Sequence, residues 1–345
     1  MSSQANTLFL SHKDILSLDI SVKECIDTTL LILKEHGCKR TMLPPKPSIV
    51  PREGVFFTAI PTYLKDLNIS GVKWVSRFPD NKKMPKVMST IVLNDMQTGL
   101  PLAVMDAGWI TAMRTGATAA LTAKYFGIKH FSTISIMGLG VQSVAVLLCF
   151  KEMFKDLKNV KLFEYKDTAQ RFVKRFLRHT KKFLNPKGSD KLKDMAFLHA
   201  SDFNFSWHKD MKDLFHNSDV VVTAPTYAPK PFVKPSWLES GLLALPIHHR
   251  GWEKCVSSFD KIVTDDANQL EHYMEGDAPK VYAEIGEVFA GKKKGRKNDR
   301  EKILAYNIGL AVSDIALADY VYNIAVKEDI GCRYELNNYD GVFWL

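Results

Sequence analysis

The sequence predicts an α/β protein with a doubly wound parallel sheet and a second, α+β domain. Two observations predict the parallel sheet: short apolar strands alternate with helices from Ser132 onward, and a glycine-containing turn follows the first of these strands. The third observation concerns the rest of the chain, where a hairpin pattern and long helices rich in small residues replace this alternation. We therefore expect the flanking segments to form the second domain.

Length and composition fit this expectation. The chain has 345 residues, of which 46% are hydrophobic and 25% charged, so it contains enough apolar material for a substantial core. Its five cysteines are widely scattered, which argues against a disulfide framework and favours a reducing compartment. We find no signal-peptide pattern and no apolar run long enough to span a membrane. We expect a cytoplasmic protein that does not contact membranes.

The formal net charge is +9, which raises the possibility of a nucleic-acid partner. Much of the excess lies in two clusters, Lys174 to Lys193 and Lys292 to Lys297. Neither cluster is interleaved with aromatic residues as a base-stacking surface would be. We interpret them as solvated helix faces and a basic loop, and expect no nucleic-acid binding; an RNA-associated protein is the weaker alternative.

The first part of the chain mixes helices and strands. Apolar residues at helical spacing predict a helix over Val22–His36 that ends at Gly37, and alanines mark another over Trp109–Tyr125. Strand patterns, the last two joined by a turn at residues 97–99, cover Gly54–Ile60, Gly71–Val75, Ser89–Asn94 and Leu102–Met105.

The second part begins at Ser132. Its predicted strands are Thr133–Met137, Val160–Glu164, Val220–Thr223, Leu242–Leu245 and Lys261–Thr264. Its predicted helices are Val141–Met153 and Thr168–Phe183. A last amphipathic helix over Tyr306–Ile330 is again rich in small residues, and we expect it to return to the first domain.

The turn after the first parallel strand has the pattern of a dinucleotide-binding site. Gly138 permits a tight turn, and Gly140 removes a side chain where backbone approaches a pyrophosphate. The helix that starts at Val141 offers free N–H groups to the phosphates. Val144 occupies the position of the usual third glycine. This turn predicts a Rossmann-type domain; the alternative is a glycine turn that binds nothing.

Residues after the second parallel strand bear on cofactor choice. Glu164 stands where an acidic residue binds the ribose hydroxyls and favours NAD. Lys166 lies close enough in sequence to hold the 2′-phosphate of NADP instead. We expect NAD, with NADP as the alternative.

Several segments together resemble the ornithine cyclodeaminase/μ-crystallin family. The resemblance runs from about residue 40 to 331, and the matching blocks stand in the family's order. They are Gly71–Asn81, Thr111–Leu121, Gly138–Gln142, Asp219–Thr223, Glu287–Gly291 and Gly309–Asp314.

The resemblance implies two domains. Residues 1–127 with 306–345 would form a substrate-binding and dimerisation domain, and residues 128–305 an NAD(P)-binding Rossmann domain. It also implies a homodimer and hydride transfer at the α carbon of a small amino acid, its keto acid or its imine. By the same resemblance, the cofactor would contact Gln142, Thr223, Ala224 and Pro225 in addition to the turn and the residues after the second strand.

Three basic residues are candidates for the substrate site. Arg114 has the planar fork that pairs with a carboxylate, and it matches the family's arginine. Lys46 stands roughly where the family often has a second carboxylate-binding arginine. Lys73 lies in an apolar strand that should desolvate it and lower its pKa, and the resemblance makes it an acid or a polarising group. The alternatives are a helix-surface ion pair and two solvated lysines.

The chain departs from the family where ornithine cyclodeaminases carry a catalytic aspartate. That stretch reads Leu245 to Glu253, and the aspartate position falls near Arg250. His248, His249 or Arg250 would face the nicotinamide instead, with histidine as a proton carrier; a packing or surface role is the alternative. No third ligand stands at metal spacing, so we expect no metal site. Asp314, on the last helix, completes the list of catalytic candidates.

These observations favour an NAD(P)-dependent oxidoreductase: an amino-acid dehydrogenase, an imine or ketimine reductase, or an opine-like synthase. Loss of the aspartate argues against its first rival, a cyclodeaminase-type lyase that recycles NAD. A non-enzymatic, crystallin-like binding protein is the second rival. The sequence does not identify the substrate.

Overall fold

The computed structural model describes residues 5–183, 203–225 and 231–337, with side chains omitted for 178–183 and for the ends of the terminal strands. The chain divides into two compact units, one made of Met1–Arg114 with Leu310–Leu345 and the other of Thr115–Gly309. The first boundary falls inside helix α3 (Gly108–Phe126), earlier than the expected boundary at residue 127, and the second falls at Gly309 and not at 305.

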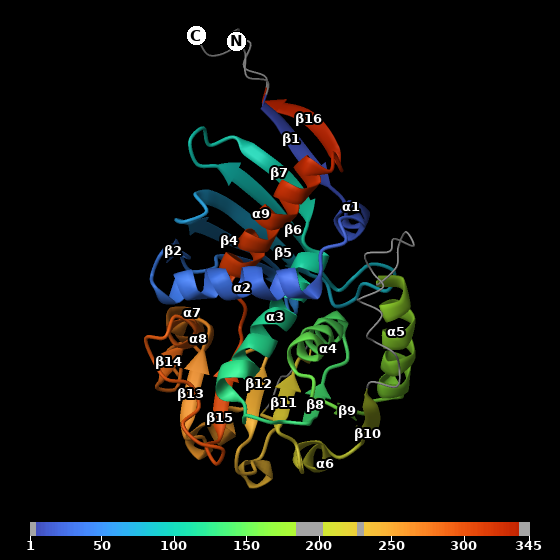
Figure 1. Ribbon diagram of the computed structural model, residues 1–345, viewed down its shortest axis with the longest axis vertical. Helices are drawn as coiled ribbons and strands as arrows, with labels where there is room; N and C mark the ends of the chain where they lie inside the picture. Colours follow the sequence, from blue (N-terminus) through green and yellow to red (C-terminus); the bar gives the residue numbers. More distant parts are fainter. Residues whose placement is uncertain (1–4, 184–202, 226–230, 338–345) are drawn as a thin grey trace. The chain divides into compact units, whose positions relative to one another are not determined.

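Unit 1 contains an eight-stranded sheet in the order β16-β1-β7-β6-β5-β4-β2, with β3 paired to β4 (Figure 1). Most neighbours are antiparallel, whereas β1 and β7 are parallel. The strands are β1 (Ala5–Leu10), β2 (Thr41–Met42), β3 (Ser48–Arg52), β4 (Val55–Leu64), β5 (Ile69–Arg77), β6 (Val87–Asp95), β7 (Pro101–Asp106) and β16 (Cys332–Asn337). The helices are α1 (His12–Ser17), α2 (Val22–Gly37), the start of α3, and α9 (Ala311–Lys327).

Helix α9 covers one face of this sheet, where it contacts β4, β5 and β6, and α2 packs on α9. Its close approach depends on Gly71, because a Cβ there would lie 2.9 Å from Ile315 Cδ1 and 2.6 Å from the Val92 carbonyl oxygen. Helix α2 starts with a capping box between Ser21 and Glu24, which fixes its first turn. The sheet therefore has one face closed by α9.

Unit 2 is a parallel sheet in the order β10-β9-β8-β11-β12-β15-β13-β14. Its strands are β8 (Thr133–Met137), β9 (Asn159–Phe163), β10 (Asn204–His208), β11 (Val220–Thr223), β12 (Leu243–Pro246), β13 (Lys261–Thr264), β14 (Ala283–Glu284) and β15 (Ile303–Tyr306). Its α-helices are α4 (Val141–Met153), α5 (Thr168–Phe183), α6 (Met211–Phe215), α7 (Ala267–Tyr273) and α8 (Ile285–Phe289). Two 3-10 turns cover Pro235–Trp237 and Glu253–Ser258.

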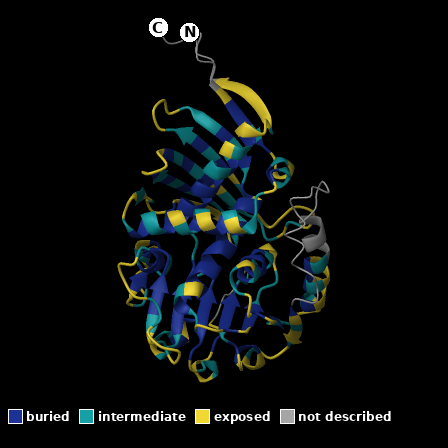
Figure 2. Cartoon of the chain, in the orientation of Figure 1, coloured by how far each residue is buried: buried dark blue, intermediate teal, exposed yellow. Residues whose placement is uncertain are grey.

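The strand order of unit 2 reverses direction between β8 and β11. From β8 the chain proceeds outward through β9 and β10, then returns to β11 and continues through β12 on the other side. Ligands of open α/β sheets bind outside the carboxyl ends of the strands at such a switch point. The central strands β8, β11 and β12 are buried except at Met137, the last residue of β8, as their apolar sequences predict (Figure 2).

The fold confirms the predicted doubly wound sheet, with the strands at 133–137, 220–223 and 261–264 and the helix at 141–153 at their predicted bounds. One prediction is wrong. Tyr306 ends strand β15 and does not begin the last helix, which starts at Ala311. Gly309 has φ +87°, a left-handed conformation that interrupts regular structure and separates the two elements.

Two features bear on the expected partners. Among the described residues, no helix is long and apolar enough to cross a membrane. In the second basic cluster Arg296 is not a solvated charge, because its Nε donates to the Phe126 carbonyl at 2.6 Å. Part of the first cluster, from Lys174 to Lys193, lies outside the described residues.

Candidate active site

A buried ionic cluster in unit 1 joins three of the candidate residues. Lys73 comes from β5, Arg114 from α3 and Asp314 from the first turn of α9. One oxygen of Asp314, Oδ1, lies 2.7 Å from Lys73 Nζ and 3.2 Å from Arg114 Nε. The side chains of Lys73 and Asp314 are only 3% and 1% exposed. Such a cluster persists only because each charge has a partner, since an unpaired charge at this depth is costly.

Sequence reasoning missed one member of this cluster. The hydroxyl of Thr111, one helical turn before Arg114, donates to the same Asp314 oxygen at 3.3 Å. The spacing of Thr111 and Arg114 places both on one face of α3. That spacing was visible in the sequence, but its target, Asp314, was about 200 positions away.

Burial and charge perturb both ends of the Lys73–Asp314 pair. Burial, reinforced by the positive charges of Arg114 and Lys46, lowers the pKa of Lys73 to about 8, although Asp314 opposes the shift. Burial alone would raise the pKa of Asp314, but Arg114 and Lys73 outweigh it and hold that pKa below its usual value. Lys73 thus titrates close to neutral pH while Asp314 stays ionised.

Lys46 is brought to the same region by the sheet. It is buried, and the next residue, Pro47, accepts a hydrogen bond from Ala59 N–H of β4 at 3.1 Å. Residue Ile60 of β4 lies directly opposite Lys73 in the register. Lys46 therefore stands at the level of Lys73, close enough for its charge to lower the pKa of Lys73.

The predicted phosphate turn lies at the switch point of unit 2. Gly138 has φ +91°, and a Cβ there would lie 2.4 Å from the Ala224 carbonyl oxygen, so only glycine fits. Gly140 has nothing within 4 Å of the corresponding Cβ position. It is also the N-cap of α4, with no side chain to occupy the helix N-terminus, and Val141 is the first residue of that helix. The open space and the helix end together form a cradle for a phosphate.

Two side chains lie beside this turn, and the sequence indicated only the first of them. The Oε1 atom of Gln142 is buried, and no donor among the described residues reaches it, so it is an acceptor that a bound hydroxyl or amide would satisfy. Arg175 of α5 donates from Nη2 to the Leu139 carbonyl at 2.9 Å and braces the turn. Nothing in the local sequence indicated this role for Arg175, because it depends on how α5 packs.

The residues expected to select the cofactor lie after β9. Glu164 follows the strand directly, is buried, and accepts a long hydrogen bond of 3.4 Å from Ala169 N–H. Lys166 has φ +51°, and its ammonium lies 5.2 Å from the centre of the Tyr165 ring. The Glu164 carboxylate therefore lies at the first turn of α5, whereas the Lys166 ammonium lies over the ring of Tyr165.

The ends of β11 and β12 complete this edge of the sheet. Thr223 is the last residue of β11, and Ala224 N–H donates to the Met137 carbonyl of β8 at 2.7 Å. Pro225 follows, and residues 226–230 of the loop after it lie outside the described residues. His248 lies after β12, with Nε2 at 3.1 Å from Thr223 Oγ1.

The two residues after His248 are arranged differently. His249 stacks on Tyr273 with ring centres 5.1 Å apart, and the exposed Arg250 donates from Nε to His249 Nε2 at 3.1 Å. Of the three residues near the family's aspartate position, His248 is therefore the one bonded to the strand end that flanks the phosphate turn.

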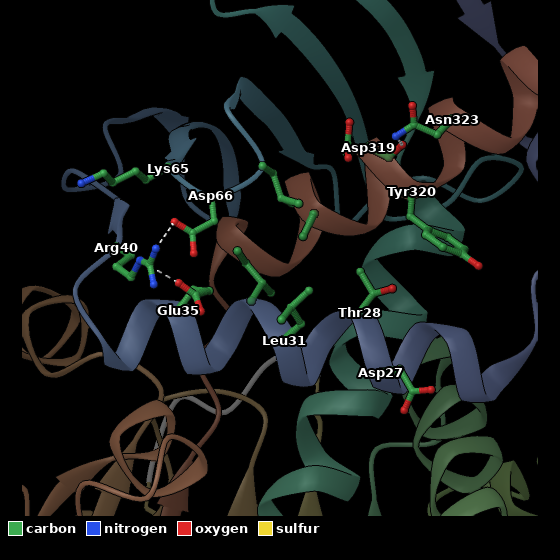
Figure 3. Close-up of a pocket in the computed structure, with 13 residues that line it drawn as sticks. Asp27, Thr28, Leu31, Glu35, Arg40, Lys65, Asp66, Asp319, Tyr320 and Asn323 are labelled. Carbon is green, nitrogen blue, oxygen red and sulfur yellow. Dashed lines mark hydrogen bonds and ion pairs between the residues drawn. The ribbon is translucent and has the colours of Figure 1, made fainter.

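A separate groove of about 360 Å³ lies in unit 1 between α2 and α9 (Figure 3). Arg40 bridges Glu35 and Asp66 at one end, with N–O distances of 3.1 and 2.7 Å. Asp319 and Tyr320 line the α9 side. None of the residues predicted from the sequence to bind substrate or cofactor lines this groove.

The comparisons agree with this geometry. A family model described as the ornithine cyclodeaminase/mu-crystallin family matches residues 6–329. The chain belongs to this family. A curated relative, the alanine dehydrogenase of Archaeoglobus fulgidus, is 31% identical over 95% of this chain and 98% of its own length.

Two solved structures of the family are similar throughout. The Δ1-pyrroline-2-carboxylate reductase of Thermococcus litoralis, in complex with NADH and L-proline, has a TM-score of 0.80 at 28% identity and covers 94% of this chain and 99% of its own. An archaeal alanine dehydrogenase dimer with bound NAD has a TM-score of 0.78 at 28% identity and covers 96% and 100%. The similarity spans both units of this family member.

Proposed function

We propose that this family member is an NAD-dependent oxidoreductase that transfers hydride at the α carbon of a small amino acid or of the corresponding imine or keto acid. The observation that carries the proposal is the buried cluster of Lys73, Arg114 and Asp314 in a chain that also has an open dinucleotide turn at Gly138–Gly140. Relatives named as alanine dehydrogenase and pyrroline-2-carboxylate reductase support it.

The residues of unit 2 fit NAD. Gly140 leaves room for a pyrophosphate at the start of α4, and Glu164 stands at the position that binds the adenosine ribose. Because the Lys166 ammonium lies over Tyr165, we favour NAD over NADP. When bound, the nicotinamide supplies the hydride or accepts it.

The residues of unit 1 would bind the amino acid. Asp314 holds the Nε side of Arg114 and so fixes the orientation of its guanidinium, which pairs with the substrate carboxylate. Lys46 adds a second positive charge at the same level of the sheet. Fixing the carboxylate orients the α carbon, and such positioning supplies much of the rate in hydride transfer.

Lys73 would donate and accept the proton in the reaction. With a pKa of about 8 it is protonated near neutral pH, and it then donates a proton to the substrate nitrogen or oxygen as hydride reaches carbon. In the reverse direction the neutral amine accepts that proton. Asp314 stabilises the charged form of Lys73 and keeps its Nζ in place.

The test offers the protein a panel of substrates and monitors turnover by the absorbance of NADH. Pyruvate with ammonium, cyclic imino acids, and keto acids with small amines are offered with NADH, and amino acids with NAD. The proposal predicts net cofactor turnover with at least one of these classes. Ammonia release from ornithine without net cofactor change would favour the lyase. Tight NADH binding with no turnover of any class would favour the crystallin-like binder.

We also infer that the protein is a homodimer. The face of the unit 1 sheet opposite α9 exposes apolar side chains on β3 and β5, namely Ile49 and Trp74. Trp74 is 43% exposed and stacks on Phe57, which presents a rigid aromatic surface. Exposed apolar side chains on one face of a sheet favour an interaction site there. The similar archaeal alanine dehydrogenase is a dimer.

A further inference from the structure

The loop after β12 makes two hydrogen bonds to the Thr223 hydroxyl and a third within the loop. His248 Nε2 lies 3.1 Å from Thr223 Oγ1, and Trp252 Nε1 donates to the same oxygen at 3.1 Å. The backbone N–H of Arg250 points back to the other ring nitrogen, His248 Nδ1, at 3.2 Å. The imidazole is therefore bonded on both sides.

These bonds fix the protonation state of the ring. A backbone N–H only donates, so His248 Nδ1 must be the acceptor and carries no proton. In the neutral ring the proton is then on Nε2, which donates to Thr223 Oγ1. The indole N–H of Trp252 also only donates, so the threonine oxygen accepts from both sides.

The surroundings of the ring oppose a second proton. Burial lowers the pKa of His248 to about 4, helped by the nearby positive charges of His249 and Arg250. The groups that face it from other elements, the Thr223 hydroxyl and the Phe232 ring, carry no charge. Protonation of Nδ1 would also set it against the N–H of Arg250.

Thr223 connects this loop to the phosphate turn. It lies beside Met137 in the β8–β11 register, and the next residue, Ala224, is bonded to the Met137 carbonyl. The Ala224 carbonyl forms the wall against which Gly138 packs without room for a Cβ. A contact that fixes the end of β11 therefore also fixes the Ala224 carbonyl that packs against Gly138.

We propose that His248 is a positioning residue for the cofactor-binding edge of unit 2, holding the end of β11 through Thr223, and is not a proton carrier. This inference rests on the proposed function, because it assumes that NAD binds at the Gly138–Gly140 turn. It replaces the sequence-based interpretation in which His248 exchanges protons with the substrate.

The experiment compares two variants by NADH affinity and by pH profile. His248→Leu removes the bond to Thr223, and we expect the Kd for NADH to rise about fivefold to tenfold, the effect of one lost hydrogen bond. His248→Gln keeps an N–H that reaches toward Thr223, and it should recover most of that affinity. Both variants should keep the wild-type shape of the kcat/KM pH profile between pH 5 and 9.

Thr223→Val tests the same bond from the other side. It should weaken NADH binding at least as much as His248→Leu, because it also removes the acceptor of Trp252 Nε1. The double variant should be no worse than Thr223→Val, because both lack the bond between residues 223 and 248. His130→Gln, at an exposed histidine of unit 2 that pairs with the exposed Asp156, is the matched control and should leave the Kd unchanged. If His248→Leu fails to fold, the His248→Gln and Thr223→Val variants still test the inference.

A catalytic role for His248 would give a different result. If His248→Gln lowers kcat a hundredfold or more, removes an ionisation from the pH profile and leaves the Kd for NADH unchanged, His248 is a proton carrier and the inference is wrong. Additive defects in the double variant would also overturn it. Failure of the wild-type protein to bind NADH at all would instead overturn the proposed function, and this inference with it.

Discussion

At the scale of single residues, the proposed chemistry depends on the Asp314 carboxylate, which accepts hydrogen bonds from three donors. Lys73, Arg114 and Thr111 all reach its Oδ1 atom, so removing one donor changes the position of the others. Effects of such coupled residues are not additive. The role of each residue is therefore best inferred from which kinetic constant, kcat or KM, changes in its variant.

Arg114→Lys keeps the charge but loses the planar fork and the Nε bond to Asp314. We expect the KM for the carboxylate substrate to rise about tenfold to a hundredfold, a loss of about 1.4 to 2.8 kcal/mol, while the Kd for NADH stays close to wild type. Steady-state kinetics and NADH fluorescence measure the two. Arg52→Lys, in an exposed ion pair with Asp80, is the matched control and should change neither. An unchanged KM in Arg114→Lys would show that another group binds the carboxylate.

The pKa of Lys73 predicts opposite pH dependence for the two reaction directions. Its value of about 8 lies below the ordinary lysine value because burial disfavours the charged form. Reduction needs the protonated amine, so kcat/KM for imine or keto acid should be highest below pH 8 and fall above it. Oxidation of the amino acid needs the neutral amine and should rise through the same pH.

Initial rates between pH 6 and 10 in both directions measure this dependence. Lys73→Met should remove the break and leave a low, flat profile. A reductive profile that stays level up to pH 10 in the wild-type protein would contradict a proton-donating role for Lys73.

At the scale of elements, the turn between β8 and α4 contains two glycines with different physical requirements. Gly138 needs its left-handed φ and lies against Ala224, whereas Gly140 has an ordinary φ of −95° and open space at its Cβ position. The first should matter for folding and the second for the ligand.

Gly138→Ala should lower the melting temperature by about 5 °C or more, since both the backbone conformation and the contact become unfavourable. Gly140→Ala should melt within about 1 °C of wild type. It should nevertheless raise the Kd for NADH about tenfold or more, because its methyl group occupies the space of the pyrophosphate. Thermal unfolding and NADH titration of both variants distinguish the two roles. Normal NADH affinity in Gly140→Ala would place the cofactor elsewhere.

Local patterns predicted the elements well where one segment decides its own structure. The Val141–Met153 helix and the fully apolar strand Val220–Thr223 needed only periodicity and length. The strand Ile303–Tyr306 was not predicted, and Tyr306 was assigned to the last helix, because a short apolar run before a helix fits either structure and its pairing with β12 and β13 is remote in sequence. The terminal strands β1 and β16 were not predicted for the same reason.

The candidate site was predictable in part. The turn glycines form a contiguous motif, and Arg114 and Lys73 stand in recognisable segments. The pairing of Lys73 with Asp314 joins residues 241 positions apart, so the sequence named both without joining them. The bond of His248 to Thr223 was equally invisible, because it depends on the packing of β11 beside β12.

At the scale of the whole molecule, the exposed outer face of the unit 1 sheet predicts self-association. Trp74→Glu places a charge beside Phe57 on this face and should convert the dimer to a monomer at micromolar concentration. Light scattering after size exclusion measures the mass. Trp207→Glu, at an equally exposed tryptophan on the edge strand β10 of unit 2, is the control and should remain dimeric. A wild-type monomer would contradict the homodimer, and a dimeric Trp74 variant would place its interface elsewhere.

The central claim is that the protein moves a hydride between the nicotinamide and a substrate α carbon. The most direct measurement is mass spectrometry of the amino acid formed from a cyclic imine or keto acid with NADH that carries deuterium at the transferable position. The account predicts one deuterium at the α carbon of the product for each NADH consumed. An amino-acid product without deuterium, or ammonia released from ornithine with the NADH pool unchanged, would contradict it.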